Sequence, residues 1–583
     1  MSWSDASGGA PWDFVVVGGG SAGCVLAESL SRDPSLKVLL VEGGRDLKPG
    51  AEPAEILDMY PGVAAFDPGN HWPDIAANFT PVGHNAPPRR PERCYEQARV
   101  MGGGSSINGQ VANRGTPDDY DEWSAAGATG WKWDDVLPYF RAIERDMDFG
   151  GPLHGSAGPI PIHRIPRRSW PRFSTATADA LLALGHADIG DQNGVFGDGW
   201  FAQSLSNDGR HRVSAAMGFL GPATRARRNL LVLADAHVRR LVLSGRRVTG
   251  IEIERDGARA TISSAQTIVS AGAIQSPALL MRSGIGPGGE LRALGIDVAL
   301  DLPGIGRNLQ EHPGISISAF IRRGARLADT TRRHNHVALR FSSGREGSPR
   351  SDLYMMAIAK SGWHPVGRRT GTLVAWLNKV HSRGRVMLRS PDPSVGPLAN
   401  FDFLADPRDA RRLVDAFRFL ARLARTPPLA DWIENPSPST YAGVARALGP
   451  RSLRNVLATA PAAFLLDMLP PLRRLAMERI VSGGASLDDL LADDESLEAH
   501  VRARVFGQWH PCGTCRMGPR EDRDAVVDPL QARVHGIEGL RVVDASVMPT
   551  APRANLNLPT MMVAAKFGDA ITRASAAGGA RPT

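Results

Sequence analysis

Three glycines near the N-terminus have the spacing of a phosphate-binding turn. The apolar run from Asp13 to Val17 predicts a strand, and small and apolar residues then recur at helical spacing over 24–31. Between them, one glycine permits a tight turn, the next lets the backbone approach a pyrophosphate, and the third lets the helix pack closely on the strand. The amides at the helix start would point at the phosphates. The residues predicted to form this turn and its contacts are Gly18, Gly20, Ser21, Ala22 and Gly23.

A carboxylate completes this motif. A second apolar strand is predicted over 37–41, and Glu42 follows at its end, 22 residues after Gly20. A carboxylate in that position can accept hydrogen bonds from a ribose diol. The order of strand, turn, helix, strand and acid therefore predicts a βαβ unit that binds an adenine dinucleotide. The pattern does not choose between NAD and FAD, and the alternative is an ordinary strand-to-helix turn followed by a surface glutamate.

The composition is that of a large globular protein. The 583 residues are 42% apolar and 22% charged, which excludes intrinsic disorder and permits a core large enough to enclose a cofactor. The basic excess of +8 is nearly all arginine, and no basic run is interleaved with aromatic residues, so we expect no nucleic-acid partner. Residues 1–12 lack the apolar core of a signal peptide, and no apolar run approaches the ~20 residues that cross a bilayer.

The cysteines favour a reducing, cytoplasmic location. Cys24, Cys94, Cys512 and Cys515 are too few and too scattered for a disulfide framework. The spacing of Cys512 and Cys515 would also suit a redox dithiol or a zinc site. However, the sequence offers no second pair of zinc ligands to join Cys512 and Cys515, and these two residues do not begin a thioredoxin-like helix. We therefore expect two buried, inert thiols and no metal.

The remaining chain divides into regions with different patterns. Residues 46–95 are rich in proline, glycine and asparagine and predict a long irregular excursion. Residues 407–505 are mostly helical in pattern, and within them 453–480 combines apolar residues with arginines and prolines. That segment predicts a partly buried helical pair, with a membrane-surface or lid helix as the alternative. Strands are expected at 230–233, 238–243, 248–254 and 267–270, and an antiparallel sheet from 315–321, 337–341, 371–377 and 386–388.

Four further segments carry motifs. They are Met-Gly-Gly-Gly-Ser-Ser-Ile-Asn within 99–123, Ala-Gly-Ala-Ile-Gln-Ser-Pro within 271–287, Trp-His-Pro-Cys-Gly-Thr-Cys-Arg-Met-Gly at 509–518 and Ala-Asn-Leu-Asn-Leu-Pro within 541–562. Together, and in this order, they resemble the glucose–methanol–choline (GMC) oxidoreductase family of flavoenzymes over nearly the whole chain. Within that family, residues 95–97, 101–108, 152–155 and 191–193 are most similar to bacterial oxidases and dehydrogenases of furanic and related alcohols.

The resemblance implies that the dinucleotide is FAD. A flavin ring is flat and needs close backbone approach, and the glycines at 102–104 remove the side chains that would block it. Some family members attach FAD through a histidine just before the asparagine of this loop. This chain has Ile107 there, so we expect non-covalent FAD. The remaining contacts implied by similarity are Met101, Gly104, Ser105, Asn108, Gly109, Val111, Val238, Trp509, Asp544 and Ala545.

The resemblance also assigns the chemistry to His510 and Asn555. Oxidising an alcohol requires loss of the hydroxyl proton and transfer of the α-hydride to flavin N5. A neutral imidazole, with a reference pKa of about 6.5, can accept that proton, which makes His510 the general base. The Asn555 amide can hydrogen-bond the alcohol oxygen as alkoxide character develops. Asn557 is the rival to Asn555, and alignment on Pro552 and Met561-Met562 favours Asn555.

The expected substrate pocket lies beside this pair. By similarity, Val374 and Trp376 line it together with Trp509, for which simple packing is the alternative. His312, in the run Asn-Leu-Gln-Glu-His-Pro, is expected to be structural.

We therefore expect an α/β protein (α+β overall) with two domains. The FAD-binding domain is Rossmann-like and discontinuous, over 1–160, 205–312 and 503–583. The substrate-binding domain, over 161–204 and 313–502, is an antiparallel sheet covered by helices. The expected reaction is oxidation of a primary alcohol, aromatic or furanic, to an aldehyde, with the further step to the acid left open and O₂ as the acceptor. The oligomeric state is not predicted.

Three alternatives stay open at this point. A dehydrogenase acting on choline-like or aliphatic alcohols would use the same site and pass electrons to a quinone or another acceptor. A hydroxynitrile lyase or a photodecarboxylase would use the same fold for other chemistry. A non-catalytic flavin-binding module would have no reason to keep a base and an amide donor together.

Overall fold

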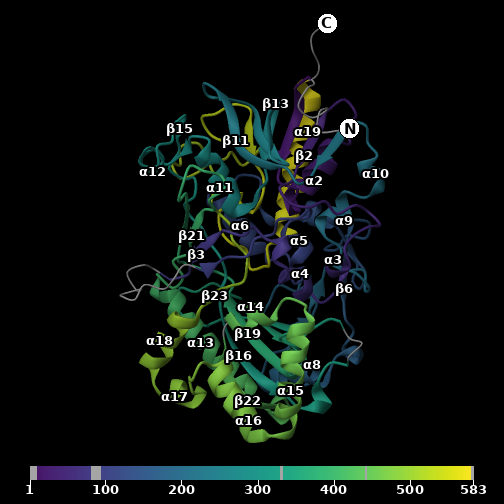
Figure 1. The fold of residues 1–583 in the computed structure, drawn as a ribbon, viewed down its shortest axis with the longest axis vertical. Helices are drawn as coiled ribbons and strands as arrows, with labels where there is room; N and C mark the ends of the chain where they lie inside the picture. The colour runs from purple at the N-terminus through teal and green to yellow at the C-terminus, as the bar shows by residue number, and fades with distance from the viewer. Residues whose placement is uncertain (1–9, 81–92, 329–331, 440–442, 579–583) are drawn as a thin grey trace.

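The structure, a computed structural model, describes residues 10–80, 93–328, 332–439 and 443–578. Two large sheets lie toward opposite ends of the longest axis of the molecule (Figure 1). Helices and sheets are mixed throughout, which confirms the predicted α/β class.

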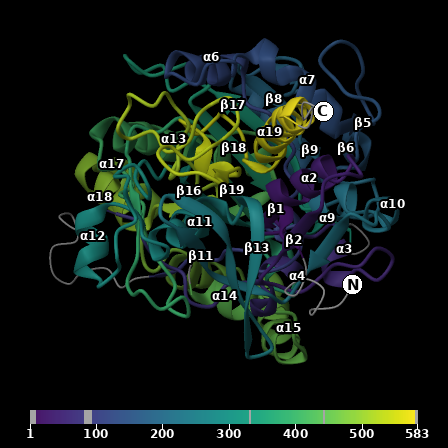
Figure 2. The same ribbon diagram turned by 90° about the horizontal axis from the view of Figure 1, so that it is seen from above.

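The first sheet contains the predicted βαβ unit. Strands β10, β2, β1, β24 and the second half of β13 pair in parallel, and their Val and Leu side chains are largely buried. Parallel strands need both faces covered, which explains these nearly continuous apolar runs. Helix α2 (Ser21–Leu30) packs on β1 and β2, with α19 (Asn557–Gly578) beside it (Figure 2). The strand order is β10 (Leu230–Leu233), β2 (Val38–Val41), β1 (Trp12–Val17), β13 (Ala258–Val269), β12 (Arg247–Arg255) and β11 (His237–Ser244), with β24 (Leu540–Val542) also paired to β13.

The second sheet is mainly antiparallel. Helices α8 (Arg172–Ala183) and α13 (Pro407–Ala424) pack against it. Only β7 and β8 pair in parallel within its described strands. Its order is β22 (Ile433–Ser439), β16 (Pro313–Ile321), β19 (Thr370–Leu377), β18 (Leu353–Ile358), β17 (Asn335–Phe341), β8 (Gly199–Ala202) and β7 (Asp188–Gly190), with β23 (Phe506–Gly507) also paired to β16.

Three local expectations need correction. The strand predicted at 386–388 is β20 (Arg385–Met387), and it belongs to a separate four-stranded sheet with β21 (Leu398–Asn400), β3 (Ala76–Asn78) and β4 (Arg93–Cys94). The helical region 407–505 contains a strand, β22, because tertiary pairing with β16 outweighs local propensity. The excursion 46–95 contains short regular elements in its described part, among them α3 (Ala54–Leu57), α4 (Gly62–Ala65) and η1 (Pro68–Asn70).

The segment 453–480 forms a helical pair, as predicted. Helix α15 (Leu453–Met468) is followed by α16 (Pro470–Ala476) and by one π-helical turn, η7 (Met477–Val481). Its burial is less than expected, because most of its large apolar side chains are exposed. Within the described residues, none of the helices combines the length and the apolar character needed to cross a membrane.

The remaining elements are short or connect the two sheets. They are α5 (Gly104–Ile107), α6 (Pro117–Ala125), α7 (Trp133–Ile143), β5 (Glu144–Asp146), β6 (Ile160–Arg164), η3 (Arg167–Ser169), β9 (Ser204–Leu205), α9 (Ala215–Phe219), α10 (Pro222–Arg225), α11 (Gly272–Arg282), β14 (Ile285–Gly286), α12 (Gly288–Ala293), β15 (Leu300–Asp301), η4 (Arg323–Ala325), η5 (Gly367–Arg369), η6 (Leu429–Asp431), α14 (Gly443–Leu448), α17 (Leu487–Ala492), α18 (Asp494–Arg504) and η8 (Ala545–Val547).

Candidate active site

One large cavity brings together most of the predicted site residues. Its volume is about 1060 Å³, at the upper end of the range for ligand pockets, and its walls come from both large sheets. The predicted residues that line it are Gly18, Gly20, Ser21, Ala22, Glu42, Gly104, Ser105, Asn108, Gly109, Val111, Val238, Val374, Trp376, Trp509, His510, Asp544, Ala545 and Asn555. Two of the predicted contacts, Gly23 and Met101, do not line it.

The N-terminal glycine turn has the backbone geometry that its motif requires. Gly18 has a φ of +102°, and a Cβ there would lie 2.5 Å from the carbonyl oxygen of Ser270. Helix α2 begins after Gly20 without a side chain capping it. Its first N–H groups are therefore available to phosphate oxygens.

Gly23 and Met101 support this turn from behind. A Cβ on Gly23 would lie 1.8 Å from the Gly18 carbonyl oxygen, so Gly23 faces the strand. The buried Met101 sulfur would lie 2.4 Å from a Cβ on Gly19. Gly23 thus has the packing position that the motif gives its third glycine, and Met101, for which similarity implied a cofactor contact, packs against the turn.

Glu42 is held by the turn that it completes. Its Oε2 accepts a hydrogen bond from the Gly19 amide (2.8 Å) and its Oε1 accepts one from the Gly44 amide (2.8 Å). Burial raises the pKa of Glu42 to about 7, although both amides favour the carboxylate. Each oxygen keeps a further lone pair, so the carboxylate can hold the turn and still accept a ribose hydroxyl.

The second glycine loop packs directly on the first. Gly103 has a φ of +54°, and a Cβ there would lie 2.8 Å from the Gly20 Cα. A Cβ on Gly104 would meet nothing within 4 Å, because this residue faces the open cavity. The buried Arg212 guanidinium holds the loop by donating to the carbonyl oxygens of Ser105 (3.2 Å) and Asn108 (2.7 Å). Arg212 could not be predicted from the sequence, because no motif marks it.

Asp544 lies at the same end of the cavity as the N-terminal glycine turn. It caps η8, and its Oδ2 accepts hydrogen bonds from the Gly272 amide (2.8 Å) and the Ser276 hydroxyl (2.5 Å). Burial raises the pKa of this carboxyl above its ordinary value. Two motifs far apart in the sequence, 271–277 and 544–545, therefore meet at one point beside the glycine turn.

His510 and Asn555 are in direct contact on the cavity wall. The Asn555 Nδ2 lies 2.8 Å from the His510 Nε2. The Asn555 backbone is held in turn by Asn113, whose Oδ1 accepts from the Asn555 amide (2.8 Å). Asn557 points elsewhere, since its Oδ1 accepts from the Ser21 hydroxyl (3.4 Å). The geometry therefore pairs Asn555, and not its rival, with His510.

His312 lies on the other side of the His510 ring. The two Nδ1 atoms are 2.9 Å apart, and burial, with His312 as a lesser cause, holds the pKa of His510 well below its ordinary value. Burial also lowers the pKa of His312 to about 4. We expected His312 to be structural, and nothing in the sequence indicated that it contacts His510 across the fold.

A buried carboxylate fixes the His510 backbone. Both oxygens of Glu311 accept from the His510 amide (2.9 and 2.8 Å), and Oε1 also accepts from the His312 amide (2.7 Å). The Tyr95 hydroxyl donates to Glu311 Oε2. Burial raises the pKa of Glu311 to about 7, while these donors favour the ionised form. Glu311 thus ties both histidine segments to one point.

The opposite wall of the cavity is built by alternate residues of the second sheet. Side chains of a strand alternate between its two faces, so every second residue of β16, β18 and β19 faces the cavity. Val374 and Trp376 are two of them, and Trp376 stacks on Tyr354 with ring centroids 4.6 Å apart. Residues of this wall that sequence reasoning missed are Met356, Ile358 and Phe506, which pack with Val374 and Trp376 in one apolar cluster.

Trp509, Cys512 and Cys515 lie in the segment that carries His510. Trp509 lines the cavity but is 37% exposed, and its Nε1 donates to Glu96 Oε2 (3.2 Å). Cys512 and Cys515 are unpaired and buried, as predicted, and burial raises the pKa of both thiols.

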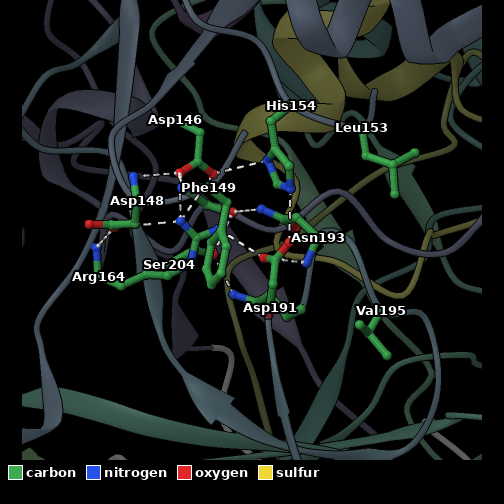
Figure 3. Close-up of polar contacts among 12 residues, drawn as sticks. Asp146, Asp148, Phe149, Leu153, His154, Arg164, Asp191, Asn193, Val195 and Ser204 are labelled. Carbon is green, nitrogen blue, oxygen red and sulfur yellow. Dashed lines mark hydrogen bonds and ion pairs between the residues drawn. The ribbon is translucent and has the colours of Figure 1, made fainter. Parts of the chain in front are cut away.

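A second polar cluster lies outside the cavity, around His154 (Figure 3). The His154 Nε2 lies 2.9 Å from Asp191 Oδ2, and its Nδ1 lies 3.1 Å from Asp146 Oδ2. Arg164 donates to Asp146 (2.9 Å) and Asp191 (2.9 Å) and stacks over the Phe149 ring. Although burial alone would lower it, the pKa of His154 is raised to about 10 by its carboxylate partners. These pairings balance charge within the protein, so we interpret the cluster as a structural ion network.

This network reaches the candidate site through Asn193. The Asn193 amide donates to Asp191 Oδ1 (3.0 Å), and its side chain bonds the backbone of Ala112 (2.9 Å) and Arg114 (3.2 Å). Asn113, which lies between those two residues, holds Asn555. The His154 cluster therefore fixes the irregular segment 112–114, whose Asn113 holds Asn555.

Comparisons with known proteins agree with this geometry. Two GMC oxidoreductase family models match residues 12–314 and 380–564. The chain is 41% identical to 5-(hydroxymethyl)furfural oxidase of Methylovorus sp. over 96% of its length and 98% of that protein. It is 31% identical to the oxygen-dependent choline dehydrogenase of Staphylococcus xylosus, covering 96% and 94% of the two chains.

A solved structure shows the same fold. The pyridoxine 4-oxidase of Mesorbium loti superposes with a TM-score of 0.79 at 28% identity, covering 96% of this chain and 98% of that one. Family models, relatives and fold agree over nearly the full length. The chain therefore belongs to the GMC oxidoreductase family and is an FAD-dependent alcohol oxidase or dehydrogenase.

Proposed function

We propose that the enzyme oxidises a primary alcohol with an aromatic or furanic ring to the aldehyde, and the aldehyde hydrate onward to the acid. The observation that carries this proposal is the 2.8 Å contact between His510 Nε2 and Asn555 Nδ2, in a cavity that Trp376 and Phe506 also line. In this proposal, FAD accepts the hydride from the alcohol carbon when bound and later gives the electron pair to O₂.

The hydrogen bonds around His510 support its role as the base. An amide nitrogen only donates, so His510 Nε2 must accept from Asn555, and the proton of the neutral ring sits on Nδ1. That proton is donated to His312 Nδ1 at 2.9 Å. The lowered pKa keeps His510 neutral at working pH. Its Nε2 lone pair therefore faces the cavity and takes the hydroxyl proton when an alcohol displaces the Asn555 contact.

Asn555 then donates a hydrogen bond to the alcohol oxygen. Its Nδ2 is already directed at the place where the proton leaves, and an amide donor there stabilises developing alkoxide charge. The positive charge that His510 carries afterwards would stabilise superoxide, which favours O₂ as the acceptor. Measurement of peroxide formed per turnover under air tests that choice against a quinone.

The aromatic wall supports the proposed substrate class. Trp376, Phe506 and Met356 offer flat and adaptable apolar surfaces in the cavity that His510 also lines. The relative at 41% identity carries the name of a furan-alcohol oxidase, in agreement with that wall.

We propose non-covalent FAD, held along the cavity from the glycine turn to Asp544. The fit rests on the bare α2 N-terminus, the free lone pairs of Glu42 and the open space in front of Gly104. Ile107 lines the cavity at the position where some relatives carry the attaching histidine. Ile107 offers no nucleophile. Trichloroacetic acid precipitation should therefore release all of the flavin into the supernatant.

The sheets support the proposed division into an FAD-binding domain (1–160, 205–312 and 503–583) and a substrate-binding domain (161–204 and 313–502). All strands of the first sheet fall in the first set of ranges. Those of the second sheet fall in the second set, except β23, which crosses over to pair with β16. We also propose a reducing, cytoplasmic location, because all four cysteines are unpaired.

Replacement of His510 tests the function. His510→Ala should lower the rate of anaerobic flavin reduction by benzylic and furanic alcohols by about 10²–10⁴-fold, because it removes the general base. The variant should still bind FAD, and His364→Ala, which changes another cavity histidine, serves as the control. The panel should include aliphatic, choline-like and sugar alcohols. An unchanged reduction rate in His510→Ala would refute the assignment.

A further inference from the structure

The outer surface of the α15–α16 hairpin is the largest apolar feature that the catalytic site leaves unexplained. Leu453 is 74% exposed, Leu457 65% and Phe464 63%. Monomeric proteins rarely expose clustered side chains of this size unless the patch binds something. The patch consists of Leu453, Leu457, Phe464, Leu465, Met468, Leu469, Leu472, Leu475 and Ile480.

Helix α15 is apolar on two faces, and only one is covered. At ~100° per residue, its large apolar residues that are exposed, from Leu453 to Met468, fall within an arc of about 120°. Thr459 and Ala463, which are buried, lie on the opposite side. The covered face explains why the helix packs on the protein, and the outer stripe requires a separate explanation.

The charge around the patch is one-sided. Arg451, Arg454 and Arg479 are exposed, and none of the described carboxylates pairs with them. The acidic residues of 443–481 are Asp467 and Glu478, and both are already neutralised within the protein, by Arg326 and Arg369 and by Arg474. The patch is therefore an apolar stripe beside uncompensated positive charge.

We infer that this surface docks on an anionic lipid bilayer. Apolar side chains that enter the acyl region, next to arginines that meet lipid phosphates, are the features of a helix lying in a membrane interface. A second copy of this chain is a less suitable partner for this surface than a bilayer. A two-fold interface would bring the unpaired arginines of both copies into one contact, whereas Asp467 and Glu478 are already paired within each copy.

The position of the hairpin agrees with surface docking. It lies at the end of the molecule farthest from the first sheet (Figure 1) and at the edge of the outline in the perpendicular view (Figure 2). Leu465, Leu472 and Ile480 belong both to the patch and to the lining of the catalytic cavity. Docking would therefore bring the cavity mouth to the lipid surface.

Vesicle flotation of the holoenzyme tests this inference. We expect binding to vesicles that contain phosphatidylglycerol, weaker binding to pure phosphatidylcholine, and weakening by salt. Leu457→Ser with Phe464→Ser should lower the partition coefficient at least tenfold. Neither residue lines the cavity, so flavin content and alcohol oxidation in solution should not change. Arg451→Glu with Arg454→Glu should lower binding to phosphatidylglycerol vesicles only.

Leu530→Ser is the matched control, because Leu530 is 65% exposed but lies outside the patch and the cavity. The inference is overturned by absence of vesicle binding, or by equal binding of the wild type and the Leu457→Ser/Phe464→Ser variant. It is also overturned if the wild type without vesicles forms a dimer that Phe464→Ser dissociates. The outcome of the flotation assay does not bear on the assignment of His510 as the base, because flotation does not depend on turnover.

Discussion

The Nδ1 atoms of His510 and His312 lie 2.9 Å apart in the core of the protein, although 198 residues separate them in the chain. A hydrogen bond between two imidazole nitrogens needs one proton, so the tautomer of one ring decides that of the other. Because Asn555 donates to the far side of His510, the shared proton belongs to His510. We therefore propose that His312 keeps the Nε2 of the proposed base unprotonated and so acts as a positioning residue.

Removal of the His312 acceptor should impair proton transfer. We expect His312→Leu to lower the rate of flavin reduction by about 100-fold, because His510 can then place its proton on Nε2. His312→Asn offers an acceptor oxygen and should restore most of the rate. The measurement is anaerobic stopped-flow reduction across pH, and a merely structural role predicts equal loss in both variants without a change in the pH profile.

Substitutions of the two asparagines near the start of α19, Asn555 and Asn557, should have different effects on flavin reduction. Asn555→Ala removes the donor to His510 Nε2 and to the alcohol oxygen, so we expect a loss of about 10²–10³ in the reduction rate constant with FAD retained. Asn557 also lines the cavity, but its side chain contacts the Ser21 hydroxyl and not His510, so in Asn557→Ala the reduction rate constant should change less than about threefold. Steady-state kinetics of both variants with the preferred alcohol check this. Equal losses would show that the assignment of Asn555 is wrong.

Gly104 offers a test of flavin contact that is separate from folding. A Cβ on Gly104 meets no protein atom within 4 Å, so Gly104→Ala should leave the melting temperature of the apoprotein unchanged or slightly raised. In the holoenzyme it should weaken FAD binding by about tenfold or more, because the methyl group occupies the cavity. Gly221→Ala is the control, since its Cβ also meets nothing and it lies outside the cavity. Unchanged FAD affinity in Gly104→Ala would remove this loop from the binding site.

The His154 cluster predicts a pH-dependent contribution to stability. The folded pKa of His154 is raised from 6.5 to about 10, so the protonated ring stabilises the folded state fully below pH ~6.5. This contribution disappears as the pH rises through about 10. His154→Gln should therefore lower the melting temperature most near pH 6, progressively less as the pH rises, and little above pH 10, as differential scanning fluorimetry can measure.

At low pH the same cluster should weaken for another reason. The pKa values of Asp146 and Asp191 are lowered, with His154 and Arg164 as the favourable partners, so their contribution is lost as these carboxylates become protonated. A constant difference in melting temperature between the wild type and His154→Gln from pH 6 to pH 10 would contradict the ion network.

Much of the fold could be predicted because buried strands have a recognisable pattern of apolar residues in the local sequence. Val15 to Val17 and Val38 to Val41 read as buried parallel strands, and β1 and β2 occupy those positions. The strand β22 could not be predicted, because its residues adopt extended structure only through pairing with β16. β20 was predicted as a strand, but its sheet was not, because its partner β21 is recognised only in the folded chain.

The amino-acid sequence by itself determined the chemical groups: the glycine turn, Glu42, His510 and Asn555 are recognisable from residue type, spacing and family resemblance. The tertiary structure alone decided which groups touch. It put His312 against His510, turned Gly23 and Met101 away from the cavity, and left the outer face of α15 uncovered. The physical reason is that residue type records what a side chain can do, whereas contact and burial depend on segments brought together by the packing of both sheets.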